Sequence, residues 1–231
     1  MGGRVALIIP ALDEEESIGP TLDEPMTLPL AQVMVVDNGS RDRTAEVARA
    51  HGAQVISEPR RGYGSACLAG IAALRPDIEI VAFLDADGNS DPADLPALLA
   101  PIEGGEADLV VGSRVLGQAE PGSLPAQQRF GNWLATRLLR VFFGARYTDL
   151  GPLRAIRRSS LQQLGMCELT FGWTIEMQIK AHRARLRVVE IPARSRARRS
   201  GQSKISGSLS GTIRAGWKIL GTIARYRLGV R

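Results

Sequence analysis

The sequence predicts an α/β fold with a mostly parallel central sheet and helices on both of its faces. Apolar runs of strand length alternate with segments that carry helix-start and helix-stop residues, which is the order of a parallel sheet. The first run, at 4–9, is continuously apolar after Arg4, as expected of a strand buried on both faces. The 231 residues suffice for one sizeable domain, which we expect over 1–205, followed by a basic amphipathic helical tail over 206–231.

The first half of the chain contains five predicted strands with helices between them. The second helix is capped by Asp42 or Thr44 and stopped by Gly52, while Pro20 and Pro25 restrict the first. The strands are expected at 4–9, 32–36, 53–56, 79–84 and 109–112, and the helices at 13–20, 44–50, 66–74 and 92–99.

The second half is less regular. A loop at 118–127 is expected to precede a helix at 128–143, whose apolar side chains recur at helical spacing and should face the core. They are Phe130, Trp133, Leu134, Leu138, Val141 and Phe142. A strand at 149–157, helices at 159–164 and 174–184, and a last strand at 188–191 complete the predicted elements.

Polar clusters follow four of the predicted strands directly, at 10–14, 37–40, 85–87 and 113–114. Ligands of open parallel sheets bind beyond the carboxyl ends of the strands, where such clusters converge. The sequence therefore predicts a ligand site on this rim.

The cluster after the fourth strand carries two carboxylates. Asp85 and Asp87 project to the same side of an extended chain, and Ala86 between them leaves room for a ligand. Hard oxygen donors in this arrangement suit Mg²⁺ or Mn²⁺. The alternative is that both acids are ordinary turn and cap residues at a strand end.

The net charge of +5 is unevenly distributed, with a basic excess after Arg129 that is densest at 183–199. This excess favours an anionic partner such as phosphate, acidic lipid or nucleic acid, or else a solvated arginine-rich face. A basic surface without interleaved aromatic residues or a known motif is weak support for nucleic-acid binding. We therefore expect no nucleic acid among the partners.

Two further features bear on location. Cys67 and Cys167 lie far apart without metal-ligand spacing, which predicts a reducing compartment. The short apolar run at the start is followed at once by acids, unlike a signal peptide, and no stretch of about 18 apolar residues occurs. We expect a cytoplasmic protein, at most peripheral on the cytoplasmic face of the membrane.

The tail at 206–231 has apolar residues near one helical face and cations around them. That pattern fits a helix lying on acidic lipid, with Trp217 near the head groups. Packing on the core or a contact between two copies in a homodimer is the alternative.

Seven sequence motifs together resemble a known family. IPALDEEESI, VVDNGSRD, RGYGSA and DAD, in this order, are similar to the family 2 glycosyltransferases with the nucleotide-diphospho-sugar (GT-A) fold. DLGPLRAIR, GWTIEMQIKA and RSGQSKISG resemble its polyprenyl-phosphate glycosyltransferase subgroup, which includes dolichol-phosphate mannose synthase. Sugar-phosphate nucleotidyltransferases fit less well, because they carry a Gly- and Arg-rich signature where this chain has PALDEEES.

The resemblance implies a nucleotide-sugar site on the matched motifs. Asp37 would contact the base or ribose, Asp85 the ribose or the metal-bound diphosphate, and Asp87 would be the principal ligand of Mg²⁺ or Mn²⁺. Asp13 departs from the family, where asparagine is usual. The implied nucleotide-sugar contacts are Pro10, Ala11, Glu14, Asp37, Gly64, Asp85, Ala86 and Asp87.

The family also implies cations for the phosphates of the donor or acceptor. Arg114 and Arg129 would neutralise phosphate charge, and Arg199 and Lys204 would form a basic flap over the phosphates. Arginine suits this task because its planar fork binds two oxygen atoms at once.

The expected reaction is metal-dependent transfer of a hexose, glucose or mannose, from a UDP- or GDP-sugar to a polyprenyl phosphate, with inversion. A soluble hydroxyl acceptor or a glycan is the alternative; it would need a general base, for which Glu176 is the candidate. Glu176 alternatively caps a helix or pairs with Lys180 or Arg183. A non-catalytic sugar-nucleotide-binding protein is the alternative of another class.

Overall fold

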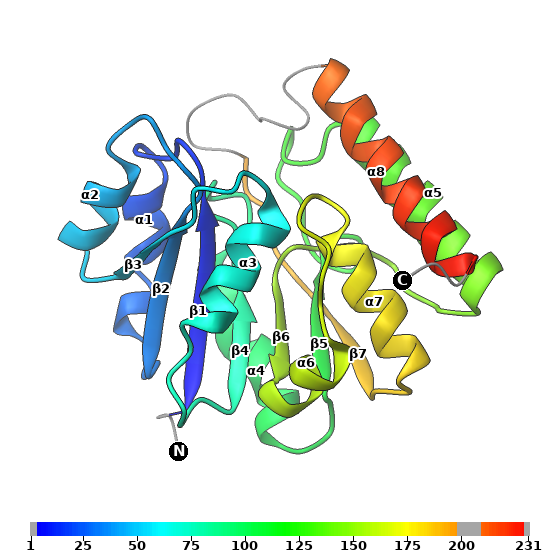
Figure 1. Ribbon diagram of the computed structural model, residues 1–231, viewed down its shortest axis with the longest axis horizontal. Helices are drawn as coiled ribbons and strands as arrows, with labels where there is room; N and C mark the ends of the chain where they lie inside the picture. The colour runs from blue at the N-terminus through cyan, green and yellow to red at the C-terminus, as the bar shows by residue number, and fades with distance from the viewer. Residues whose placement is uncertain (1–3, 198–208, 229–231) are drawn as a thin grey trace.

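The computed structural model (Figure 1) describes residues 4–197 and 209–228, which build a sheet with helices around it. The strands are β1 (Val5–Ala11), β2 (Gln32–Asp37), β3 (Gln54–Ser57), β4 (Ile80–Phe83), β5 (Leu109–Ser113), β6 (Arg154–Arg157) and β7 (Val188–Pro192). The helices are α1 (Ile18–Leu22), η1 (Pro25–Thr27), α2 (Thr44–Ala50), α3 (Tyr63–Ala72), η2 (Pro92–Asp94), α4 (Leu95–Glu103), α5 (Ala126–Phe143), α6 (Arg158–Leu164), α7 (Trp173–Arg183) and α8 (Leu209–Arg227).

The described strands form one sheet in the order β3-β2-β1-β4-β6-β5-β7. All neighbours pair in parallel except β6, which runs antiparallel to β4 and β5. The prediction of a mostly parallel sheet is confirmed. The strand expected at 149–157 is shorter, because side chains take the backbone donors of its first part. The Asp149 N–H donates to Glu190 at 3.2 Å and the Leu150 N–H to Asn132 at 2.9 Å.

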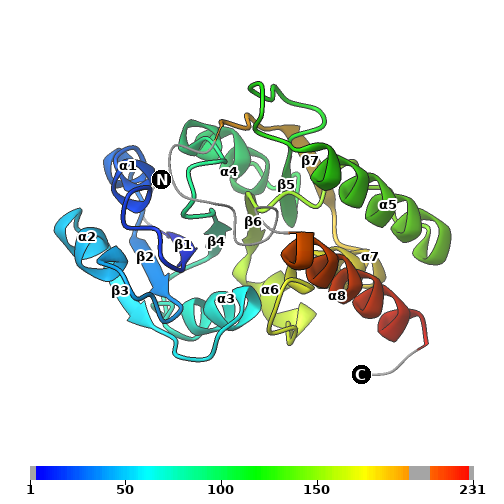
Figure 2. The same ribbon diagram turned by 90° about the horizontal axis from the view of Figure 1, so that it is seen from above.

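Alternate residues of the strands enter two separate cores, one on each face of the sheet. In β1, Val5, Leu7 and Ile9 pack with α1, α2 and α4, whereas Ala6 and Ile8 pack with α3, α6 and α7. Figure 2 shows α4 on one side of the sheet and α3 and α6 on the other. Burial on both faces explains why these strands read as continuous apolar runs.

Helices α5 and α8 lie side by side beyond the sheet, next to α7 (Figures 1 and 2). A third apolar cluster joins them, with Ala135 and Leu139 of α5 buried against Ile223 of α8. The prediction that the apolar stripe of α5 faces the core is wrong for most of it. Its exposed members are Phe130, Trp133, Val141 and Phe142. Among the described helices, none is long and apolar enough to cross a membrane.

Candidate active site

The first two polar clusters meet where β1 and β2 end. The register pairs Ala11 with Asp37, and the Asn38 N–H donates to the Ala11 carbonyl oxygen at 2.8 Å. Ser40 joins both loops, because its N–H donates to Asp37 Oδ1 at 3.1 Å and its Oγ accepts from the Asp13 N–H at 2.9 Å. The structure thus brings together the strand-end residues that were expected at the nucleotide.

Two further residues expected to contact the nucleotide lie near the same ends of β1 and β2. Pro10 is buried within β1, and Glu14 lies just ahead of α1. The Glu14 carboxylate accepts from Ser17 Oγ at 2.7 Å, and its backbone N–H donates to Thr44 Oγ1 at 2.7 Å. Glu14 therefore ties the β1 loop to the start of α2.

Gly64 lies in the first turn of α3, pressed against the loop that precedes α7. A Cβ at this position would stand 1.9 Å from the Glu168 carbonyl oxygen, so only glycine fits. Asn38 fixes the approach to α3, because it donates to the Arg60 carbonyl oxygen and accepts from the Gly62 N–H, both at 2.7 Å. The start of α3 is thereby connected to the loop after β2.

The acidic pair comes directly after β4. Asp85 Oδ1 is buried and has no hydrogen-bond partner among the described residues. Burial, and then the neighbouring charge of Asp87, raise the pKa of Asp85 to about 7. Asp87 Oδ1 accepts from the Asn89 N–H at 3.0 Å. A buried carboxylate oxygen without a donor, next to a second carboxylate, is an arrangement that a divalent cation would stabilise.

These residues fit the expected metal. Mg²⁺ and Mn²⁺ commonly take one or two protein carboxylates and complete their coordination with substrate phosphates and water. Within 4–197 and 209–228, no cluster of three His, Cys, Asp or Glu side chains has the geometry of a metal site. Asp85 and Asp87, with Ala86 buried between them, therefore remain the residues expected to hold this cation.

Arg114, which follows β5, is held in place by a two-point ion pair. Its Nε and Nη2 donate to the two carboxylate oxygen atoms of Asp149, each at 2.8 Å. Burial lowers the pKa of Arg114, but the hydrogen bonds and charge of Asp149, followed by Asp85 and Asp87, raise it above its ordinary value. Arg114 is thus a fixed cation within electrostatic range of the acidic pair.

An open cavity of about 800 Å³ extends from Arg114 and Asp149 along one side of α5. Arg129 also lines it, so the structure brings together the two arginines expected at phosphate. The polar part of the lining includes Arg114, Gln128, Arg129, Asn132, Thr148 and Asp149, and the apolar part Val115, Leu124, Phe130 and Trp133. The cavity therefore combines a cationic region with an aromatic wall.

The sequence reasoning missed the residues that hold this cavity in shape. Glu190 accepts from the Thr148 N–H and hydroxyl at 2.9 to 3.0 Å, and Asn132 Nδ2 donates to the Thr148 carbonyl oxygen at 3.1 Å. Glu190 is the one acid within the apolar strand at 188–191. An isolated charge in a strand is a signal that could have been followed.

Glu176 is fully buried, and its carboxylate is occupied by donors from three segments. Tyr226 Oη donates at 2.6 Å, the Glu168 N–H at 2.8 Å, Cys167 Sγ at 3.0 Å, and Lys180 Nζ lies 3.0 Å away. A general base must reach its substrate, so these contacts disagree with the assignment of Glu176 as a base. The expected pairing with Lys180 is confirmed, and the residue anchors α8 to α7.

A second acid, Glu168, strengthens the same anchor. Arg225 of α8 donates to its carboxylate at 2.8 Å, and Lys218 lies 3.4 Å away. Because Glu168 also packs against Gly64, the position of α8 is linked to the start of α3. We call Glu168 and Glu176 the α8 anchor.

We expect the α8 anchor to make stability depend on acid pH. Burial raises the pKa of Glu168 and Glu176, but hydrogen bonds from Thr170 and Tyr226, respectively, hold both below their ordinary value. Such carboxylates stabilise the fold fully above the unfolded-state pKa of about 4.3, and this contribution is lost as pH falls through the lower folded pKa. The melting temperature should therefore decrease as the pH is lowered from about 5. In Glu168→Gln this decrease with pH should be less steep than in the wild type. Equal slopes would contradict the anchor.

The predicted basic flap residues, Arg199 and Lys204, lie outside the described residues. The segment just ahead of them is tied to the acidic-pair loop. The backbone carbonyl oxygen of Asn89 accepts from the Arg196 N–H at 2.8 Å. The Asp91 carboxylate forms ion pairs with Arg196 at 2.7 Å and with Arg194 at 3.2 Å. Arg194 and Arg196 therefore lie beside the loop that follows the acidic pair.

The fold and its rim define a class of protein. An acidic pair after β4, strand-end loops suited to a nucleotide, and a fixed arginine after β5 on this sheet characterise the nucleotide-sugar transferases with the GT-A fold. A sequence model of the family described as "Glycosyl transferase family 2" matches residues 6–165. The chain belongs to this family and is a glycosyltransferase, which argues against a non-catalytic binding protein.

Several known proteins are similar to this one over most of its length. It is 42% identical to an uncharacterized glycosyltransferase of Mycobacterium tuberculosis, over 95% of this chain and 99% of the relative. A dolichyl-phosphate hexose transferase of Haloferax volcanii is 35% identical, over 87% and 86% respectively. Among solved structures, glucosyl-3-phosphoglycerate synthase from M. tuberculosis, in complex with Mn²⁺, UDP and glucosyl-3-phosphoglycerate, aligns with a TM-score of 0.77 at 25% identity. That alignment covers 100% of this chain and 81% of the other.

Proposed function

We propose that this glycosyltransferase uses a divalent metal to transfer a hexose, glucose or mannose, from a UDP- or GDP-sugar to the phosphate of a polyprenyl phosphate. The observation that carries the proposal is the cavity beside α5. It places Arg114 and Arg129 in one space with the aromatic side chains of Phe130 and Trp133. A lipid phosphate has the matching chemistry, with an anionic head and an apolar chain.

The donor would bind on the rim of the sheet. Asp37 and the end of β1 would hold the nucleoside, and Asp85 and Asp87 would hold the cation. A bound Mg²⁺ or Mn²⁺ would stabilise the charge that accumulates on the leaving nucleoside diphosphate. The solved relative with Mn²⁺ and UDP supports this assignment, since it has the same fold.

The acceptor phosphate would be oriented by Arg114 and Arg129. One of its oxygen atoms attacks the anomeric carbon, and the bond from that carbon to the diphosphate oxygen breaks through an oxocarbenium-like state. A phosphate is already ionised at neutral pH, so this attack needs no general base. The occupied carboxylate of Glu176 is consistent with such an acceptor. Attack from the face opposite the leaving group gives inversion.

A soluble phosphorylated acceptor is the second candidate. The structurally similar glucosyl-3-phosphoglycerate synthase was crystallised with a product of that kind. Arg114 and Arg129 would suit either phosphate. The apolar wall of the cavity favours the lipid, and so does the relative named as a dolichyl-phosphate hexose transferase.

The first test is thermal stability against UDP, GDP, CDP and dTDP, with and without Mn²⁺. At about 100 times its Kd, a ligand of the folded state adds about 2.7 kcal/mol of stability. For a chain of this size that corresponds to a rise in melting temperature of about 5 to 10 °C. We expect this rise with UDP or GDP, and only when Mn²⁺ is present. No rise with any nucleotide would contradict the proposal.

The acceptor is then tested with the donor so identified. Labelled hexose should pass to a short polyprenyl phosphate in detergent and not to 3-phosphoglycerate. Transfer to 3-phosphoglycerate alone would overturn the lipid acceptor and retain the donor site.

A further inference from the structure

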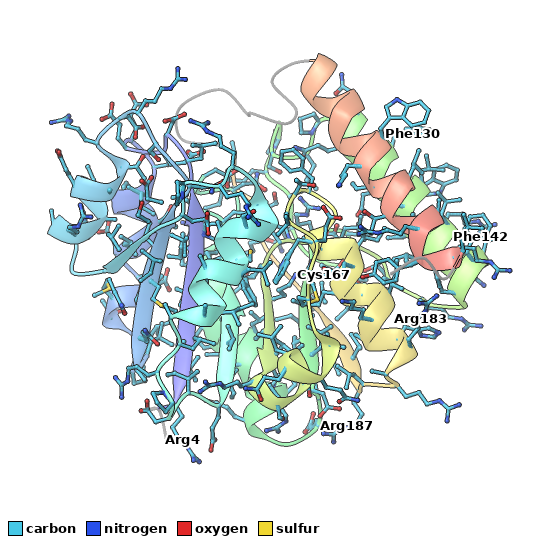
Figure 3. The ribbon with its side chains drawn as sticks, in the orientation of Figure 1. Arg4, Phe130, Phe142, Cys167, Arg183 and Arg187 are labelled. Carbon is cyan, nitrogen blue, oxygen red and sulfur yellow. The ribbon has the colours of Figure 1, made fainter. Side chains whose placement is uncertain are left out.

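Helix α5 presents large apolar side chains to solvent on the side away from the protein core. Phe130, Trp133, Arg137 and Val141 share one helical face by their spacing, and Phe142 flanks its far end. The exposed fractions are 61% for Phe130, 58% for Trp133 and 66% for Val141. Figure 3 labels Phe130 and Phe142 near opposite ends of α5, on the outer side of the molecule. We call these five residues the outer α5 face.

The surroundings of the outer α5 face are cationic. Neither α5 nor α8 contains an acidic residue, whereas α5 carries Arg129, Arg137 and Arg140, all exposed. Among the described residues, no carboxylate forms a salt bridge with these three arginines. On the neighbouring helix α8, Trp217 is 72% exposed. Exposed aromatic residues next to arginines that have no acidic partner in the described part of the chain match the interface of an acidic bilayer.

We propose that the outer α5 face and Trp217 form a docking surface for a bilayer that contains acidic phospholipid. The inference rests on the proposed function in one respect, because Phe130 and Trp133 also line the acceptor cavity. Docking through this face would place the apolar wall of the cavity at the lipid. A prenyl chain could then remain in the bilayer while its phosphate reaches Arg114.

Charge complementarity favours a membrane over a second copy of the chain. In a symmetric dimer through this face, Arg137 and Arg140 of one copy would approach the same residues of the other. Like charges opposed in an apolar contact are destabilising, since no acid of α5 or α8 could compensate them. Anionic head groups supply the missing negative charge.

The test is cosedimentation with vesicles of phosphatidylcholine alone, or with about one-third phosphatidylglycerol. The full chain should bind the acidic vesicles at least about tenfold better, and high salt should weaken the binding. The triple variant Val141→Ser, Phe142→Ser, Trp217→Ser should lower the partition coefficient by about tenfold or more. None of these three residues lines the cavity.

Met26→Ser is the matched control, because Met26 is also an exposed apolar side chain, 40% accessible, on η1. It should bind vesicles like the wild type. The triple variant should keep transfer to a short polyprenyl phosphate in detergent and lose transfer to a long acceptor in vesicles. Failure of the wild type to bind either vesicle, or equal binding by the triple variant, would overturn the docking surface. So would a dimer in solution that the triple variant converts to monomers.

The vesicle assay contains neither donor nor acceptor, so it tests docking separately from catalysis. Vesicle binding without transfer to any polyprenyl phosphate would overturn the proposed acceptor and leave the docking surface standing. Transfer to a polyprenyl phosphate in detergent without vesicle binding would support the proposed acceptor and overturn the docking surface.

Discussion

Asp87→Ala is expected to lower kcat by at least about 100-fold, because the charge that develops on the leaving diphosphate would lose its main support. The Mn²⁺-dependent rise in melting temperature with nucleotide should disappear in the same variant. Stability without ligand should be unchanged or slightly higher, since the substitution removes a charge that raises the pKa of buried Asp85. Kinetics and a thermal scan on one preparation would measure all three effects.

Asp77→Asn is the matched control for Asp87→Ala. Asp77 is half-exposed and forms an ion pair with Arg75 at 2.6 Å, away from the rim loops. It should leave kcat and the nucleotide-dependent rise unaltered. Wild-type activity in Asp87→Ala would exclude Asp87 as the metal ligand, and a large loss of stability would give it a structural role instead.

Local sequence predicted the sheet well where a strand is buried on both faces. β1 and β4 are continuously apolar and β2 is apolar between Gln32 and Asp37, and polar residues of the rim lie at or just after the ends of these strands. The segment at 149–157 was harder, because only part of it pairs. Its first backbone N–H groups donate to Glu190 and Asn132, which are distant in sequence, and such partners cannot be predicted from local periodicity.

One part of the candidate site could be predicted from the sequence and another part could not. Asp37, Asp85 and Arg114 lie at or just after the ends of strands, so the topology of a parallel sheet is enough to predict that they converge. The cavity beside α5 could not be predicted, because helical spacing shows which side chains share a face and not whether protein covers that face. Here α8 packs on Ala135 and Leu139, and the aromatic stripe is left in solvent.

Glu176 illustrates the limit most clearly. Its motif suggested a base near the acceptor, but its role depends on Tyr226, which lies 50 residues later in the chain. An acid that looks catalytic from its neighbours in sequence is thus placed between two helices. The two roles make opposite predictions for one substitution.

Glu176→Gln is expected to destabilise the protein by about 2 to 4 kcal/mol, because it leaves the Lys180 cation without its carboxylate and removes an acceptor from the buried donors. For a chain of this length the melting temperature should fall on the order of 10 °C. At a temperature where the variant is folded, kcat for a polyprenyl phosphate should stay within about tenfold of wild type, because an ionised acceptor needs no base. Thermal denaturation and steady-state kinetics measure both quantities.

Glu46→Gln serves as the control, because Glu46 occupies the first turn of α2 as Glu176 does of α7, but is exposed. It should change neither stability nor rate. If Glu176 were the base for a hydroxyl acceptor, Glu176→Gln would instead lower kcat by about 100- to 10,000-fold at nearly constant melting temperature. A base also titrates in the pH–rate profile, whereas the anchor acts on stability. If Glu176→Gln abolishes the acidic limb of the pH profile of kcat, Glu176 acts as the base. If the profile is unchanged and the melting temperature is lower, Glu176 is the residue that holds α8 beside the acceptor cavity.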